Sequence, residues 1–255
     1  MWTKEVQYLF DLNGYVIFKD YFSRTQMDRL RADLESIEAM QNLPPPLIDG
    51  KPRSSNQRYI SNIAEGSSAL LDIVKDPGIT EIVRETTSGY FRFNHSYYIA
   101  HSSGAYTSLH MGGAPIHPKA IYTVQGSRII STLTKAVIPI DNHEIDDGCF
   151  CVVPGSHKVN FDYGAEFNLG DPIMHPAIQP LDAKPGDLIL FTEALQHGGL
   201  TNRSGRVRKT IYYCYSLGNV VDWGGSLGLR CSNDLLSCED DEIRNIVSIK
   251  GRLGE

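Results

Sequence analysis

The chain has 255 residues, of which 41% are hydrophobic and 21% charged, and its formal net charge at pH 7 is −6. This length suits one large domain, and we expect a single domain over residues 1–255. The acidic balance argues against a general nucleic-acid-binding surface. No apolar run approaches the about 18 residues that a membrane span needs, so we expect neither a nucleic acid nor a membrane as partner.

The first residues lack the pattern of a secretory signal peptide, because acidic and polar side chains interrupt the apolar ones. The five cysteines are an odd number, which favours reduced thiols in a cytoplasmic protein over a disulfide framework. Cys149 and Cys151 lack the spacing and the second pair of a structural zinc site, and we expect them to be buried thiols.

Helical patterns dominate the first 90 residues. Ser23 is a candidate N-cap for a helix over 23–40, in which one face carries Met27, Leu30, Leu34 and Ile37. Residues 41–58 are rich in Pro, Gly and polar groups and predict a long loop, a candidate lid. A second helix is expected over 67–87, with an interruption near Pro77.

Short β-rich runs follow from about residue 90, punctuated by Gly, Pro and Asn. No helical pattern separates them, which favours a jelly roll over a parallel sheet. We therefore predict a mainly β fold, a double-stranded β-helix (jelly-roll or cupin-like) core over 90–218. It follows an N-terminal α-helical front over 1–90 and precedes a C-terminal extension over 219–255.

Three segments carry chemically suggestive residues: LHMGG at 109–113, DDGCFCVVPGSHK at 146–158, and the stretch 185–213 with QHGGL and RVRKTIYY. Together they resemble the phytanoyl-CoA dioxygenase-like branch of the Fe(II)- and 2-oxoglutarate-dependent oxygenases, over most of residues 10–218. The resemblance implies a ferrous ion, 2-oxoglutarate as cofactor and dioxygen as co-substrate.

The resemblance also implies the site residues. His110 and His197 match the family's metal-binding histidines, and Arg208, eleven residues after His197, matches the arginine that binds the far carboxylate of 2-oxoglutarate. Alternation along RVRKTIYYCY places Arg206, Arg208, Thr210 and Tyr212 on one strand face, which is expected to be the interior one. Thr210 and Tyr212 are therefore expected beside the 2-oxoglutarate.

Gly112 departs from the family pattern, because it stands where the family has a carboxylate ligand. Two neutral imidazoles, Fe²⁺ and doubly negative 2-oxoglutarate sum to zero, one negative charge short of the usual site. A chloride ion at Gly112 restores that charge and fits the space left by the missing side chain. The His-x-Gly pattern resembles the iron-dependent halogenases, which implies replacement of an aliphatic C–H hydrogen by chlorine on a small molecule.

Other interpretations remain open. Glu193, four residues before His197, supplies the missing carboxylate if its loop bends inward, although a place behind the ligands or at the surface is favoured. A hydroxylase that uses two histidines and water, or a catalytically dead binding protein, is also consistent with the motif. His157, in the PGSHK stretch, is expected in a tight turn and not on the metal.

The substrate is less defined. Lys51, Arg53 and Arg58 form a basic cluster in the candidate lid that suits an anion such as phosphate, and a solvated loop is the alternative. The chain is similar to small standalone halogenases that chlorinate a deoxyadenosine monophosphate nucleotide in nucleoside-antibiotic biosynthesis. No helix with an exposed apolar docking face is evident, so no carrier protein is expected as partner.

Overall fold

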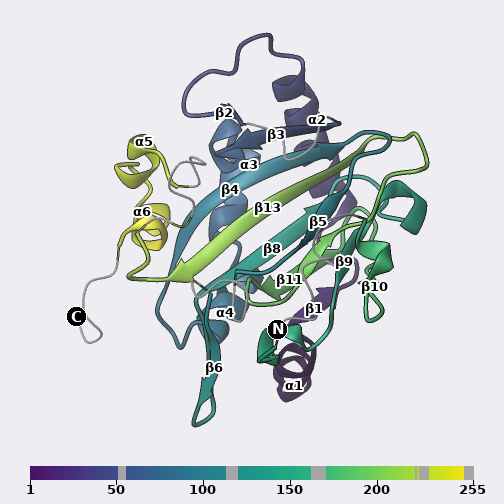
Figure 1. Ribbon diagram of the computed structural model, residues 1–255. Coiled ribbons are helices and arrows are strands. Elements are labelled where there is room, and N and C mark those ends of the chain that lie inside the picture. Colours follow the sequence, from purple (N-terminus) through teal and green to yellow (C-terminus); the bar gives the residue numbers. More distant parts are fainter. Residues whose placement is uncertain (51–55, 113–119, 162–170, 222, 224–229, 250–255) are drawn as a thin grey trace.

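The computed structural model describes residues 1–50, 56–112, 120–161, 171–221, 223 and 230–249 (Figure 1). The helices are α1 (Lys4–Asn13), α2 (Arg24–Glu38), α3 (Ser68–Asp72), α4 (Pro77–Thr86), α5 (Asn233–Leu236) and α6 (Asp241–Val247). The strands are β1 (Tyr15–Phe18), β2 (Ile48–Gly50), β3 (Gln57–Ser61), β4 (Phe91–His101), β5 (Thr107–His110), β6 (Tyr122–Gln125), β7 (Arg128–Ser131), β8 (Leu133–Pro139), β9 (Phe150–Val152), β10 (Gln179–Pro180), β11 (Leu188–Thr192), β12 (His197–Gly199) and β13 (Arg208–Leu217).

Two antiparallel sheets form the core. The major sheet has seven strands in the order β1-β11-β8-β13-β4-β3-β2, and the minor sheet has four in the order β10-β9-β12-β5. A separate two-stranded hairpin joins β6 to β7. Strands distant in sequence lie side by side, and the minor sheet faces one side of the major sheet (Figure 1). The predicted jelly-roll core is confirmed.

The α2 helix forms where its capping signals and apolar spacing agree. The Ser23 hydroxyl accepts from the Gln26 backbone N–H, and the Gln26 side chain accepts from the Ser23 N–H, which completes a capping box. The four apolar residues predicted for one face are all buried. Farther along, Asp76 caps α4 and Pro77 occupies its first turn, so the interruption predicted near Pro77 is confirmed.

Alternation along the two longest strands divides the core into two layers. On β4, Tyr98 packs in the cluster that includes helices α2, α3 and α4, whereas Tyr97 packs toward the minor sheet. On β13, Tyr213 and Tyr212 divide in the same way. One face of the major sheet therefore supports the helices, and the other lines the interior of the jelly roll.

The prediction of a long loop over 41–58 is wrong in part. Residues 48–50 form β2 and residues 57–58 begin β3, and both strands extend the major sheet beyond β4. β3 forms by pairing with β4, about 40 residues later, and β2 by pairing with β3, and local composition does not reveal this pairing. The helical front consequently also contributes β1, β2 and β3 to the major sheet.

The α6 helix packs against β4. The buried Arg92 guanidinium donates to the carbonyls of Val247, Val220 and Val221, and these bonds tie the segment after β13 to the sheet. Within the described ranges, no helix combines the length and the apolar character required to cross a bilayer.

Candidate metal centre

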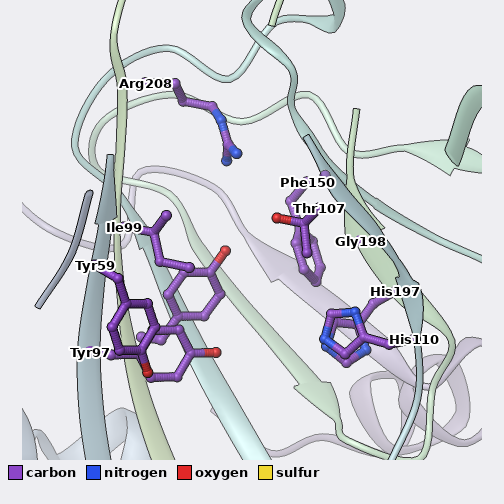
Figure 2. Close-up of a pocket in the computed structure, with 11 residues that line it drawn as sticks. Tyr59, Tyr97, Ile99, Thr107, His110, Phe150, His197, Gly198 and Arg208 are labelled. Atoms are coloured by element: carbon purple, nitrogen blue, oxygen red, sulfur yellow. The ribbon is translucent and has the colours of Figure 1, made fainter. Parts of the chain in front are cut away.

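A cavity lies between the interior face of the major sheet and the minor sheet (Figure 2). His110 and His197 lie on its minor-sheet side, and Arg208 reaches into it from β13. Its other lining residues are mainly aromatic and small: Tyr59, Tyr97, Ile99, Thr107, Phe150, Gly198, Gly199 and Tyr212.

Strand register brings the two histidines together. His110 on β5 and His197 on β12 are direct partners in an antiparallel pair, so their side chains project on the same face, with ring centroids 4.2 Å apart. His110 Nδ1 donates to the Ser108 carbonyl over 2.9 Å, and His197 Nδ1 donates to the Leu195 carbonyl over 2.7 Å. These bonds fix the tautomer in which each Nε2 carries the lone pair that a metal requires.

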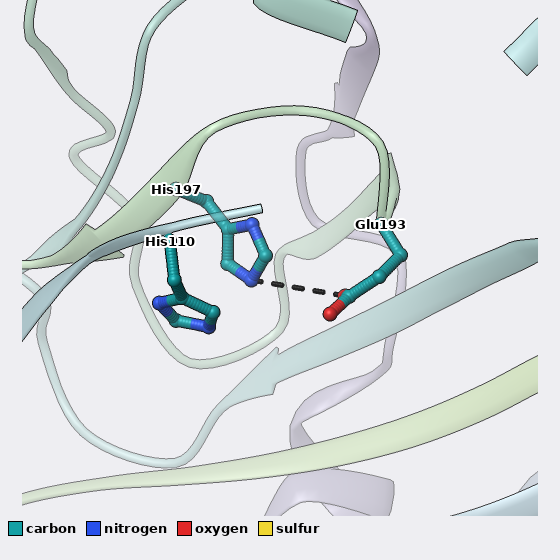
Figure 3. Close-up of side chains that lie close together, drawn as sticks. All are labelled: His110, Glu193 and His197. Atoms are coloured by element: carbon teal, nitrogen blue, oxygen red, sulfur yellow. Dashed lines mark ion pairs between the residues drawn. The ribbon is translucent and has the colours of Figure 1, made fainter. Parts of the chain in front are cut away.

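Glu193 is the third potential ligand. It lies in the turn between β11 and β12, is 5% exposed, and places a carboxylate oxygen 3.8 Å from His197 Nε2 (Figure 3). One ligand atom from each of His110, Glu193 and His197 lies within 4.8 Å of the others. The surface position is therefore wrong, because the turn directs the side chain inward, whereas the place behind the ligands stays a prediction.

Lys135 pairs with this carboxylate. Its ammonium Nζ lies 2.6 Å from Glu193 Oε2, and the lysine is only 5% exposed. It also lies over the rings of Tyr97 and Phe191. The sequence-based reasoning missed this residue. A lysine within LTKAVIP, a mainly apolar strand in which every residue is buried, was the available signal.

The space expected at Gly112 is filled. A Cβ atom added to Gly112 would lie 2.7 Å from Glu193 Cγ and 3.1 Å from atoms of Ala120 and Trp223. The glycine therefore leaves no hole of the kind predicted for a halide, because the Glu193 side chain already extends into it.

Arg208 forms the opposite end of the cavity. It is 1% exposed, Nη2 donates to His101 Nδ1 over 2.8 Å, and Nη1 donates to Thr210 Oγ1 over 3.3 Å. Its Nε has no hydrogen-bond partner among the described residues. Burial lowers the pKa of Arg208 from its usual value, and within the described ranges no ion pair joins its guanidinium to an Asp or Glu. A buried cation without a carboxylate partner provides a site for an anionic ligand.

His101 holds the guanidinium as a neutral acceptor. Burial, followed by the nearby charges of Arg208 and His143, keeps the pKa of His101 well below its usual value. Nδ1 accepts from Arg208, and Nε2 lies 2.8 Å from Gln57 Nε2 and 3.1 Å from Thr107 Oγ1. His101 is a second residue that the sequence-based reasoning missed.

The expected neighbours of Arg208 are largely in place. Thr210 is buried and binds the guanidinium, and Tyr212 lines the cavity and stacks on Tyr97 at a centroid distance of 4.5 Å. Arg206 corrects the predicted pattern: it precedes β13, its side chain is 65% exposed, and it pairs with Asp147 outside the cavity.

The basic cluster predicted for the substrate is not assembled at this cavity. Arg58 donates to the Glu38 carbonyl and pairs with Asp49, whereas its neighbour Tyr59 faces the cavity. Strand alternation explains this difference, because successive side chains on β3 point to opposite faces. Lys51 and Arg53 lie outside the described residues.

Two further predictions away from the metal are confirmed. Cys149 and Cys151 are free and buried, and burial raises the pKa of Cys149 to about 11. His157 lies in a short turn after Gly155 and contacts the Asp11 carbonyl through Nε2 at 3.0 Å. Neither group joins the histidine and glutamate cluster.

Among solved structures, the fold is similar to that of HygX from Streptomyces hygroscopicus with nickel, 2-oxoglutarate and hygromycin B bound. The TM-score is 0.75 at 20% identity, and the match covers 87% of this chain and 90% of HygX. It is also similar to the non-heme alpha-ketoglutarate-dependent epimerase SnoN from nogalamycin biosynthesis, with a TM-score of 0.63, 15% identity and coverage of 85% and 83%.

Two curated relatives match the sequence. Peroxisomal phytanoyl-CoA dioxygenase of Rattus norvegicus is 26% identical over 231 residues, which cover 81% of this chain and 66% of the rat protein. Dioxygenase lolE1 of Epichloe uncinata is 27% identical over 82 residues, 32% of each protein. The chain thus spans less than two thirds of either relative. The phytanoyl-CoA dioxygenase (PhyH) family model matches residues 10–210, and the chain therefore belongs to the phytanoyl-CoA dioxygenase family.

Proposed function

We propose that this protein is an Fe(II)- and 2-oxoglutarate-dependent oxygenase that acts on a small molecule. One observation carries the proposal: two tautomer-fixed histidines and a buried arginine, which has no carboxylate partner in the described part of the chain, face one cavity from opposite sheets. Imidazole ligands suit ferrous iron, and a guanidinium suits a carboxylate. The family and the similarity to HygX, which binds iron or nickel and 2-oxoglutarate, support the same cofactors.

Different residues would bind the metal and the 2-oxoglutarate. His110 and His197 would hold the metal, Arg208 with Thr210 would bind the distal carboxylate of 2-oxoglutarate, and Tyr212 would form the adjoining wall. When bound, iron and 2-oxoglutarate supply the oxidising power that breaks a C–H bond in the presence of dioxygen. The aromatic wall excludes water from the cofactor and positions the substrate.

Halogenation is a second candidate outcome, which follows from the resemblance of the His-x-Gly pattern to iron-dependent halogenases and requires Glu193 to leave the space beside Gly112. In that case a chloride ion would bind beside His110, and the product would carry chlorine in place of hydrogen. A deoxyadenosine nucleotide is the substrate candidate that follows from the resemblance to standalone halogenases. The support from the basic cluster is reduced, because Arg58 pairs with Asp49 away from the cavity.

Anaerobic absorption spectroscopy tests the oxygenase proposal. Addition of 2-oxoglutarate to the Fe(II)-loaded protein should produce a metal-to-ligand charge-transfer band, which should be lost in the His197→Ala variant. If the wild-type protein gives no such band, the proposal is wrong. Incubation with dAMP, chloride and dioxygen, followed by mass spectrometry, then distinguishes addition of oxygen from replacement of hydrogen by chlorine.

A further inference from the structure

We propose that Glu193 is the third protein ligand of the metal and takes the position that the family gives to a carboxylate at residue 112. The inference rests on the proposed function and deepens it. The carboxylate would then come from the turn before β12, four residues ahead of His197, instead of the end of β5.

Backbone hydrogen bonds fix Glu193 beside Gly112. The Glu193 N–H donates to the Leu133 carbonyl over 2.9 Å, and the Glu193 carbonyl accepts from the Gly112 N–H over 2.8 Å. The turn itself is closed by the bond from the Leu195 N–H to the Thr192 carbonyl. The backbone of Glu193 is therefore anchored to both Leu133, where β8 begins, and Gly112, which follows β5. Its side chain points toward His197 (Figure 3).

Gly112 and Glu193 are sterically complementary. A Cβ on residue 112 would approach Glu193 Cγ to 2.7 Å, closer than carbon atoms pack. The backbone of Gly112 is not in the left-handed region, in contrast to Gly14 or Gly148. Gly112 therefore provides room rather than an unusual backbone conformation, and the occupant of that room is Glu193.

The Glu193 carboxylate has the geometry and charge of a ligand. Neighbouring ligands at about 2.1 Å from one ion lie about 3 Å apart, so the 3.8 Å between Glu193 Oε2 and His197 Nε2 requires only a small contraction. Lys135, at 2.6 Å, balances the carboxylate charge. With Glu193 in this position, the corner assigned to chloride is filled, which favours hydroxylation over halogenation.

Mn²⁺ binding to the purified full-length chain, followed by electron paramagnetic resonance, tests the ligand directly. Glu193→Gln keeps the shape of the side chain and removes its charge. We expect the Kd for Mn²⁺ to rise by about 10-fold to 100-fold. Asp147→Asn is the matched control, since Asp147 is also buried and paired but lies outside the cavity, and it should leave Kd unchanged. A Kd in Glu193→Gln within threefold of wild type would overturn the inference.

Exchange of the two positions gives a second test that does not depend on the first. Gly112→Asp alone should weaken Mn²⁺ binding and lower Tm, because the new side chain overlaps Glu193. Gly112→Asp combined with Glu193→Ala returns one carboxylate to the corner and should recover most of the affinity lost in Glu193→Ala. Tighter Mn²⁺ binding in Gly112→Asp alone than in wild type would contradict the inference.

Chloride separates this inference from the proposed function. In the anaerobic Fe(II) and 2-oxoglutarate complex, chloride should leave the wild-type charge-transfer band unchanged and shift it in Glu193→Ala, where the corner is open. A chloride-dependent shift in wild type would overturn the role of Glu193 while the oxygenase proposal stands. Absence of the band in the wild-type protein would overturn the oxygenase proposal. The Mn²⁺ binding data would then still test whether Glu193 is a metal ligand.

Discussion

At the metal end of the cavity, the Lys135 ammonium lies 2.6 Å from the Glu193 carboxylate, whereas at the other end the Arg208 guanidinium has no carboxylate partner among the described residues. Both ends are buried. Desolvated charges are costly unless they are paired, so the first end is compensated within the chain and the second depends on neutral acceptors. The difference indicates that the arginine end, more than the metal end, requires an anionic ligand.

The largest effect is expected when the ion pair between Lys135 and Glu193 is broken. Lys135→Met leaves Glu193 buried without its partner, and we expect the free energy of unfolding of the metal-free protein to fall by about 3–5 kcal/mol. Urea unfolding measures it. Mn²⁺ should restore part of the loss, because a dication beside Glu193 replaces the missing positive charge.

The double variant Lys135→Met/Glu193→Gln is the control for this prediction. It removes both charges and should unfold at nearly the wild-type urea concentration, since replacing both members of a buried pair is close to neutral. Equal stability of Lys135→Met and wild type would show that the pair does not compensate the charge of Glu193.

Removal of the charge at the other end of the cavity, that of Arg208, should not destabilise the protein. Arg208→Met should weaken 2-oxoglutarate binding about 100-fold, because charge-assisted hydrogen bonds to a carboxylate contribute ~3 kcal/mol in total. Without 2-oxoglutarate, the same variant should be as stable as wild type or more stable, since a desolvated charge has been removed. Anaerobic titration of the charge-transfer band and thermal unfolding measure the two effects.

Arg206→Met is the matched control for Arg208→Met. Arg206 lies two residues earlier, but its side chain is exposed and paired with Asp147. Its replacement should leave the Kd for 2-oxoglutarate unchanged. A large loss of stability in Arg208→Met without 2-oxoglutarate would instead mean that the guanidinium is already satisfied in the free protein.

The family resemblance singled out His110, His197 and Arg208, and strand alternation added the neighbours of Arg208. The eleven-residue spacing from His197 to Arg208 and the alternation along β13 placed Arg208, Thr210 and Tyr212 correctly on the interior face. Strand alternation is a property of the backbone alone, so it survives without knowledge of the partners. It failed at Arg206, which lies just before the strand begins.

The Gly112 and Glu193 contact could not be obtained from those patterns. It depends on a hydrogen bond between two turns that are remote in sequence, and on the room that a glycine leaves for a side chain from another segment. Lys135 and His101 were missed for a related reason: each is polar within a buried strand, and its role follows from a partner on or just beyond the neighbouring strand of the major sheet. The short strands β2 and β3 likewise required knowledge of their pairing partners.

Acid pH should lower the stability of the folded protein, because four buried histidines, two of them close to Arg208, resist protonation. Burial holds the pKa values of His95, His101 and His143 well below the usual value, and that of His157 at about 4. These groups are neutral in the folded protein but protonate in the unfolded chain below about pH 6.5, so the unfolded state binds more protons there. Stability should therefore be full above pH 6.5 and fall by up to ~1.4 kcal/mol per pH unit for each histidine as the pH decreases.

Urea midpoints at pH 7.5, 6.5 and 5.5 measure this dependence. His157→Gln removes one titrating group that is remote from the cavity, and it should reduce the slope by about one histidine's share. An unchanged midpoint between pH 7.5 and 5.5 would show that the histidines near Arg208 accept protons in the folded state.

The smallest effect concerns the acceptor that orients Arg208. His101→Phe removes the Nδ1 acceptor at 2.8 Å from Nη2, and we expect the Kd for 2-oxoglutarate to rise about tenfold, the value of one lost hydrogen bond of ~1.4 kcal/mol. 2-Oxobutyrate, which lacks the distal carboxylate, is the matched probe: its Kd should be the same in both proteins, because Arg208 has nothing to bind. A parallel loss for 2-oxobutyrate would mean that His101 supports the cavity as a whole rather than the direction of the guanidinium, since only an effect confined to the distal carboxylate reports on Arg208.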